Sequence, residues 1–273
     1  MKPPLRRPKL GQHFLSSASY CSRIAQSLPL ALDDLVIEIG PGRGALTKLL
    51  AGRVERLAAI ELDAALAGIL QRDFENAPNV EIIEGDILKT DLAEICRRFK
   101  KDACVVFGNL PYYITSPILH HLFEARARIR RMVLLVQREV AERITSGPGS
   151  REYGYLSILA QCYSTPSVAF DIPPGAFSPP PKVHSALVEF QMTPKFPAWD
   201  EKKDAAFLAF VQACFTQKRK NLLNNLSQTY TRPRVQQALA SLDLAMHARA
   251  EQLGLNQLKK LFEMLMWPST VKW

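Results

Sequence analysis

The most specific chemical motif in the sequence is the tetrapeptide Asn109-Leu110-Pro111-Tyr112, which directly follows an apolar run. An adenine amine is a poor nucleophile because its lone pair is delocalised into the ring, and acceptors for its two N–H bonds help it to attack a methyl sulfonium. The side-chain carbonyl of Asn109 and the main-chain carbonyl of Leu110 can be those acceptors. Pro111 stiffens the loop, and Tyr112 offers a ring on which an extruded base can stack, a contact worth roughly 1–3 kcal/mol. The motif predicts a site for an adenine base; a turn with a packed tyrosine is the alternative.

A glycine-rich segment, Gly40-Pro-Gly42, follows an earlier apolar run. Glycines let the backbone pass close to a ligand, although a relaxed dinucleotide-binding pattern is also satisfied here. Glu61 ends the next apolar run and can hold the two hydroxyls of a ribose in either kind of site. Asp86 ends the third run, where its carboxylate can accept a hydrogen bond from the exocyclic amine of an adenine. Together these residues resemble the cofactor site of class I S-adenosylmethionine methyltransferases.

Phe177 stands at the head of a proline-rich turn over residues 177–182. Its ring can close the other face of a bound base, and a core phenylalanine beside a rigid turn is the alternative. Methyl transfer to an amine needs no protein base of shifted pKa, because the proton can leave after the methyl group has moved. Positioning and charge compensation are then the main contributions of the protein.

These residues depend on a sheet that brings the ends of several strands together. Apolar runs predict strands at 34–40, 56–63, 80–86, 103–109 and 132–137, and stretches with helical spacing alternate with them at 45–53, 65–74, 116–125 and 138–144. Nearly continuous apolar strands separated by helices indicate a parallel sheet that is covered on both faces. The expected fold is therefore a doubly wound α/β domain of the Rossmann-like class, whose ligands bind at the carboxyl ends of the strands.

The pattern changes after residue 166. Two further strands are expected at 167–172 and 183–191, and a polar, proline-bearing link follows over 193–203. Beyond it there are no strand signals, and five apolar residues share one helical face: Phe207, Phe210, Val211, Cys214 and Phe215. We therefore expect a methyltransferase domain over residues 1–193 and a small, all-helical, RNA-binding C-terminal domain over residues 194–273.

The charge balance favours a polyanionic partner. There are 35 Lys and Arg residues against 26 Asp and Glu, which gives a net charge of +9, so nucleic acid is a reasonable partner, with a basic solvated surface as the alternative. The five scattered cysteines show neither a disulfide framework nor a zinc-site spacing. The basic N-terminus lacks the apolar stretch of a signal peptide. We expect a cytoplasmic protein with no metal site.

The motifs together resemble the family of ribosomal RNA adenine N6,N6-dimethyltransferases of the small subunit, the kasugamycin-sensitivity enzymes. Residues 9–15 are similar to the family's N-terminal segment, the glycine loop and NLPY occur in family order, and residues 177–185 are similar to its FxPxPKVxS segment. The resemblance implies S-adenosylmethionine as the cofactor, with contacts at Gln12, His13, Leu15, Gly40, Gly42, Glu61, Asp86 and Asn109. Two positions depart from the family pattern, since His184 stands where Asp is usual and Tyr113 where Asn is frequent.

The resemblance also implies the substrate. It is small-subunit ribosomal RNA within an immature small ribosomal subunit, in which adenines near the 3′ end become N6,N6-dimethyladenosine during subunit maturation. Residues 215–226 are similar to a basic stretch of the same family, and Lys218, Arg219 and Lys220 are the expected phosphate contacts. Basic clusters at 97–101 and 126–131 are weaker candidates, because a charge run is usually a solvated face. We expect a monomer.

Three other functions remain open from the sequence. The same motifs occur in erythromycin-resistance methyltransferases, which modify large-subunit RNA. A binding protein for ribosome assembly would not need the glycines, Glu61, Asp86 or the NLPY motif. A nicotinamide oxidoreductase would not need NLPY, and no acid suited to hydride transfer is evident.

Overall fold

The computed structural model describes residues 13–217 and 220–266. The chain forms two compact units. The first comprises residues 1–141 and 167–192, and the second comprises residues 142–166 and 193–273. The predicted residues Gln12, Lys218 and Arg219 lie outside the described residues.

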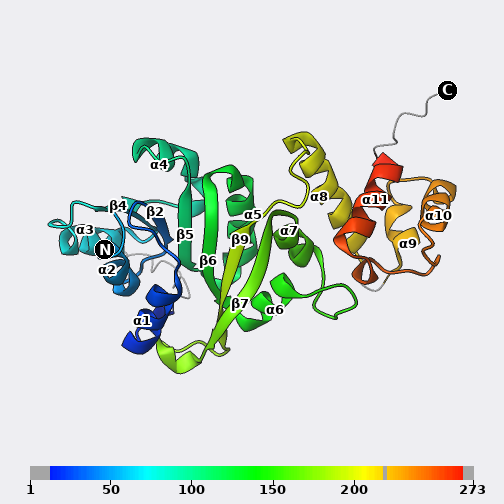
Figure 1. Ribbon diagram of the computed structural model, residues 1–273. Coiled ribbons are helices and arrows are strands. Elements are labelled where there is room, and N and C mark those ends of the chain that lie inside the picture. Colours follow the sequence, from blue (N-terminus) through cyan, green and yellow to red (C-terminus); the bar gives the residue numbers. More distant parts are fainter. Residues whose placement is uncertain (1–12, 218–219, 267–273) are drawn as a thin grey trace, which may run out of the picture. The chain divides into compact units, whose positions relative to one another are not determined.

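The central element of the first unit is a seven-stranded sheet (Figure 1). Its strands are β2 (Leu35–Ile39), β3 (Arg56–Glu61), β4 (Val80–Glu84), β5 (Cys104–Asn109), β6 (Ile129–Gln137), β7 (Ser164–Ile172) and β9 (Ser185–Met192). The order is β4-β3-β2-β5-β6-β9-β7; β2 to β6 run parallel, and β9 is antiparallel to β6. The chain winds outward from β2 to β4 and then returns to β5, which places the topological switch point between β2 and β5. The expected doubly wound α/β fold is confirmed.

Helices pack on this sheet as the alternating pattern requires. They are α1 (Ala18–Ser27), α2 (Ala45–Ala51), α3 (Ala64–Asp73), α4 (Leu92–Arg98), α5 (Thr115–Glu124) and the start of α6 (Arg138–Thr145), with short 3-10 turns η1 (Ile87–Lys89), η2 (Tyr112–Ile114), η3 (Arg126–Arg128) and η4 (Pro174–Ala176). One core cluster joins Ile24 of α1 and Leu50 of α2 to alternate strand residues such as Val36, Val105 and Val133. Successive side chains of a strand point to opposite faces of the sheet. The buried strand residues that alternate with these valines therefore face the opposite side of the sheet. The helices α1 and α4 were not predicted.

Two short strands hold the N-terminal segment in place. β1 (Phe14–Leu15) pairs antiparallel with β8 (Phe177–Ser178), and Leu15 lies opposite Phe177 in this pair. The next two backbone N–H groups, of Ser16 and Ser17, both donate to the carbonyl oxygen of Ala176 at 2.9 and 3.1 Å. Residues far apart in the sequence are thereby joined beside the sheet.

The second unit is mainly helical. It contains α7 (Tyr155–Tyr163), α8 (Glu201–Phe215), α9 (Leu222–Leu226), α10 (Arg232–Ser241), the 3-10 turn η5 (Ala250–Gln252) and α11 (Leu255–Met266). Of the expected helical face, Phe207, Phe210, Val211 and Cys214 are buried. Residues 142–166, which the sequence grouped with the first domain, pack in this unit, where the Tyr153 hydroxyl donates to the carbonyl oxygen of Leu253 at 3.1 Å.

The five cysteines are free and buried. No group of His, Cys, Asp and Glu side chains within residues 13–217 and 220–266 could hold a metal ion. None of the helices in these ranges is long and apolar enough to cross a membrane.

Candidate active site

A cavity opens at the carboxyl ends of β2, β3, β4 and β5, at the switch point of the sheet. Its volume is about 810 Å³, including the open mouth. Nine of the residues singled out from the sequence line it: His13, Gly40, Gly42, Glu61, Asp86, Asn109, Leu110, Pro111 and Tyr112. The predicted cofactor residues and the predicted base-binding loop therefore share one cavity.

The glycine loop between β2 and α2 forms one wall of the cavity. Gly40 and Gly42 have φ angles of +66° and +58°, a left-handed conformation that side chains other than that of glycine rarely adopt. A Cβ atom at Gly42 would lie 2.7 Å from Cδ1 of Phe14. The loop therefore needs glycine both for its backbone conformation and for the close approach of the N-terminal segment.

Glu61 ends β3 with its carboxylate at the cavity. Its Oε2 accepts a hydrogen bond from the Gly42 N–H at 3.0 Å, and its Oε1 accepts one from the Asp63 N–H at 3.0 Å. Burial raises the pKa of Glu61, and these backbone donors counteract part of that rise. A carboxylate has about four acceptor positions, so Glu61 keeps capacity for the hydroxyls of a ribose.

Asp86 follows β4 and caps the turn η1. Its Oδ1 accepts a hydrogen bond from the Leu88 N–H at 3.0 Å, which fixes the carboxylate at the cavity wall. Its second oxygen can still accept a hydrogen bond from an adenine amine, which is the function that the sequence predicted for it.

The NLPY loop leaves β5 and forms another part of the cavity wall. Nδ2 of Asn109 donates to the main-chain oxygen of His13 at 3.0 Å. Leu110 lines the cavity although the residue is only 1% exposed, and its N–H donates to the carbonyl oxygen of Leu135 at 3.0 Å. Pro111 has a φ of −60° and leads into η2. Asn109 and Leu110 therefore line the same cavity. Acceptance of hydrogen bonds from a base by their oxygens stays a prediction.

Tyr112 is held at both ends of its side chain. Its hydroxyl shares a hydrogen bond of 2.7 Å with the Ser185 hydroxyl, and its ring stacks on the ring of His13 with centroids 5.7 Å apart and planes 28° apart. Burial raises the pKa of Tyr112, so the phenol is neutral at physiological pH. The ring is suited to stacking.

The structure adds cavity residues that the sequence did not single out. Leu62 and Ile87 each follow a predicted acid and line the cavity, and Leu62 is exposed. Phe14, Ile114 and Ile118 also line it. Tyr113, already noted as a departure from the family pattern, lines it too and is 62% exposed. The position of Leu62 and Ile87 directly after Glu61 and Asp86 was the signal that could have identified them.

Two predicted residues do not line this cavity. Leu15 and Phe177 are 7% and 4% exposed, and both belong to the core cluster beneath α1 and α2. The structure places Phe177 where the alternative interpretation, a core phenylalanine, expected it. A direct role of either residue in binding stays a prediction.

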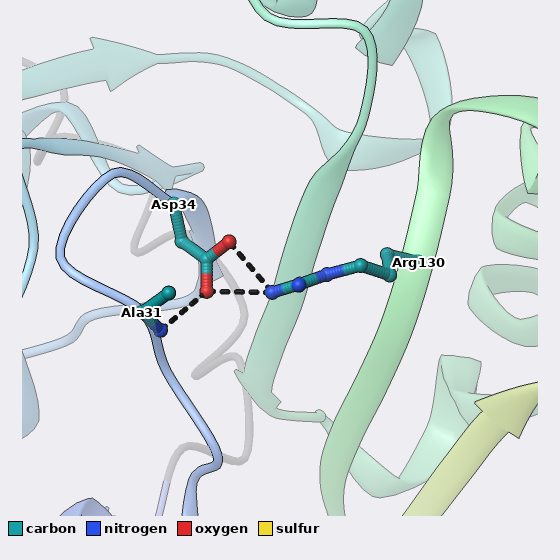
Figure 2. A network of polar contacts seen from close by, with 3 residues as sticks. All are labelled: Ala31, Asp34 and Arg130. Carbon is teal, nitrogen blue, oxygen red and sulfur yellow. Dashed lines mark hydrogen bonds and ion pairs between the residues drawn. The ribbon is translucent and has the colours of Figure 1, made fainter.

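The basic candidates differ in their surroundings. Lys220 lies within the described residues and is exposed. In the two weaker clusters, Arg98 pairs with Glu81 at 2.8 Å and Arg131 with Glu189 at 3.8 Å. Figure 2 shows the carboxylate of Asp34 between the Ala31 N–H, at 2.8 Å, and Nη2 of Arg130, at 2.6 Å from each oxygen. These pairs reduce the charge that the two clusters offer to a partner.

Comparison with known proteins covers nearly the whole chain. The family profile described as ribosomal RNA adenine dimethylase matches residues 5–266. A protein of Acidobacterium capsulatum named ribosomal RNA small subunit methyltransferase A is 45% identical over 95% of this chain and 91% of its own length. A protein of the same name from Koribacter versatilis is 42% identical over 96% of this chain and 95% of its own.

Solved structures with the same architecture also align over most of the chain. The 23S rRNA methyltransferase ErmE has a TM-score of 0.70 at 28% identity and covers 92% of this chain and 99% of its own. A dimethyladenosine transferase from Plasmodium falciparum has a TM-score of 0.79 at 24% identity, with 91% and 96% covered. The second likeness concerns the fold alone.

Proposed function

Because the chain belongs to the ribosomal RNA adenine dimethylase family, we propose that it transfers methyl groups from S-adenosylmethionine to N6 of adenines in small-subunit ribosomal RNA. The product is N6,N6-dimethyladenosine near the 3′ end. Relatives at 42–45% identity bear a small-subunit name, whereas the large-subunit enzyme ErmE is 28% identical. This difference favours the small subunit.

The single observation that carries the proposal is the shared cavity. A glycine loop with two acids and the NLPY loop face the same space, so a cofactor and a target base can meet there. A pure RNA-binding protein would need neither Glu61 nor Asp86 at this place. An oxidoreductase would not need an amide and a carbonyl directed at a base.

The residues that line the cavity suit S-adenosylmethionine in their chemistry. Glu61 would hold the ribose, Asp86 the adenine amine, and Leu62 and Ile87 offer apolar surface for the adenine ring. Gly40 and Gly42 let the backbone approach the rest of the molecule. When bound, the cofactor supplies an electrophilic methyl group on a sulfonium.

The NLPY loop acts on the target base. Oδ1 of Asn109 and the carbonyl oxygen of Leu110 accept the two N6–H bonds, which directs the nitrogen lone pair away from the ring and toward the methyl group. Tyr112 stacks on the flipped base and fixes its plane. After transfer the proton leaves to solvent. The monomethylated amine keeps one N–H bond, so in the second transfer one acceptor holds that bond and the pocket accommodates the methyl group already present. Each transfer would consume one molecule of S-adenosylmethionine.

Binding of the RNA rests on electrostatics. Lys218, Arg219 and Lys220 would neutralise backbone phosphates, and the net charge of +9 raises the local concentration of polyanions. We assign the protein to the immature small subunit as a monomeric maturation factor.

The test uses purified protein, radiolabelled S-adenosylmethionine and small ribosomal subunits from a strain that lacks the modification, with large subunits in parallel. The RNA is digested to nucleosides. Label in N6,N6-dimethyladenosine of the small subunit supports the proposal if Asn109→Ala abolishes it and the exposed control Asn76→Ala does not. Label in the large subunit alone, or none despite cofactor binding measured by calorimetry, overturns it.

A further inference from the structure

We propose that the side chain of His13 is a positioning residue for methyl transfer: it locks residues 13–17 onto the NLPY loop so that Asn109 presents its carbonyl oxygen to the target base. The inference rests on the proposed function and assigns His13 a role in the acceptor half of the site.

The first step is the orientation of the Asn109 amide. The main-chain oxygen of His13 lies 3.0 Å from Nδ2 of Asn109. A carbonyl oxygen can only accept, so the amide nitrogen of Asn109 faces His13 and Oδ1 is the end left for the cavity. An amide turned by 180° would present N–H bonds to the N–H bonds of the adenine amine. The contact with His13 therefore selects the orientation that catalysis needs.

The second step is what holds the backbone of His13 in place. Nδ1 of its ring lies 2.8 Å from the main-chain oxygen of Pro179. Since that oxygen only accepts, Nδ1 carries the proton and donates. The ring of His13 also stacks on the ring of Tyr112, with the two ring centroids 5.7 Å apart. One side chain thus links the segment after β8 to the loop after β5.

The third step is the anchor of this arrangement. Ala176 accepts hydrogen bonds from the N–H groups of Ser16 and Ser17, and Leu15 pairs with Phe177 in the core. Residues 176–179 therefore clamp residues 13–17, and the hydrogen bond from His13 to Pro179 is a clamp contact whose donor residue lines the cavity. The proline-rich turn acts on the site in this way although Phe177 does not line it.

Three variants separate the hydrogen bond from the ring. His13→Ala removes both. His13→Asn keeps an N–H donor at the same number of bonds from Cα as Nδ1, and His13→Phe keeps a ring without the donor. We expect kcat to fall about 100-fold in His13→Ala, the loss typical of a displacement near 1 Å, while KM for the RNA stays within about threefold. We expect His13→Asn to recover most of kcat and His13→Phe to recover little.

The measurements include readouts besides activity. Calorimetry gives the cofactor Kd and thermal unfolding gives Tm. A cofactor contact of the His13 side chain, as the family resemblance implied, would raise the Kd in His13→Ala, whereas the positioning role leaves both Kd and Tm near the wild-type values. In protein with ¹⁵N-labelled asparagine, the side-chain signals of Asn109, identified by their loss in Asn109→Ala, should shift in His13→Ala and return in His13→Asn.

Wild-type kcat or unshifted Asn109 signals in His13→Ala would overturn the inference. Failure of His13→Asn to recover more than His13→Phe would overturn it as well, and so would a loss of cofactor affinity as large as the loss of kcat. If the wild-type protein methylates no small-subunit RNA, the proposed function fails, whereas the Asn109 signals still test the lock.

Discussion

The carboxylate of Glu61 and the backbone N–H of Gly42 are joined by a hydrogen bond of 3.0 Å. The bond ties the end of β3 to the glycine loop after β2, so the acid and the loop hold one another in position. Backbone donors around a carboxylate stabilise its charged form. The half of the cavity that we propose for the cofactor is therefore assembled before a ligand arrives, which reduces the ordering that binding requires.

Gly42 should tolerate no side chain. Gly42→Ala places a Cβ atom 2.7 Å from Phe14 and forces alanine to a φ of +58°, a strain of about 1–3 kcal/mol. We expect cofactor affinity to fall at least about 10-fold, the equivalent of 1.4 kcal/mol, as measured by calorimetry. The control is Gly68→Ala in α3, where an added Cβ meets nothing within 4 Å and should raise stability by roughly 0.5–1 kcal/mol. Wild-type affinity in Gly42→Ala would contradict the role given to the loop.

Substitutions of Phe177 can distinguish a role in the core from a role in the active site. Phe177→Ala should lower the free energy of unfolding by about 3–5 kcal/mol, as expected for a core phenylalanine, because the ring is 4% exposed. Phe177→Leu keeps most of the apolar volume and should lose less than half as much. Urea unfolding measures both. If Phe177→Leu is stable and binds the cofactor yet transfers no methyl group, the aromatic ring acts on the base after all.

Glu38 makes stability depend on pH. It is fully enclosed beneath the glycine loop, and burial raises its pKa from 4.5 to about 7; its Oε2 has no hydrogen-bond partner within the described residues. The folded state thus favours the neutral acid. Its contribution to stability is fully present below about pH 4.5, decreases as the pH rises through 7, and totals about 3 kcal/mol at 1.36 kcal/mol per pKa unit.

Glu38→Gln removes this titration. We expect the variant to lose less stability than the wild type between pH 5 and pH 8, by up to about 3 kcal/mol in urea unfolding. The control Glu84→Gln changes an exposed carboxylate at the end of β4 and should follow the wild type. Equal pH dependence in Glu38→Gln and the wild type would show that the acid is charged in the folded state.

The sequence was sufficient for the sheet and for the cavity. Strands such as β2, in which all five residues are buried, produce the run that a sheet covered on both faces requires. Glu61 and Asp86 stand at or just after the carboxyl ends of their strands, where the cavity opens. The short helices α1 and α4 were missed. α1, with the sequence ASYCSRIAQS, buries only Cys21, Ile24 and Ala25, and most of its other residues are small or polar, so its apolar pattern is weak.

Contacts between segments far apart in the sequence could not be predicted. Nothing in the local pattern of His13 indicates Pro179, 166 residues away, as the partner of its ring. The same holds for Arg130, which looked like part of a basic cluster until the fold placed it beside Asp34. The sequence shows which residue types occur, and the packing decides which charges remain available.

The exposed Lys220 and the paired Arg130 should therefore differ in their contribution to RNA binding. Lys220→Ala and Arg130→Ala each remove one positive charge, so the two variants can be compared directly. We expect Lys220→Ala to weaken binding to small-subunit RNA and to reduce the slope of log affinity against log salt by roughly 0.7, the value for one phosphate on a single strand. Arg130→Ala breaks a pair whose arginine is 55% exposed and should cost at most about 1 kcal/mol of stability, with the slope unchanged. Binding is measured by titration at several salt concentrations. If the slope of log affinity against log salt is less steep in Arg130→Ala than in Lys220→Ala, the RNA contact lies instead on the surface around the amino end of β6.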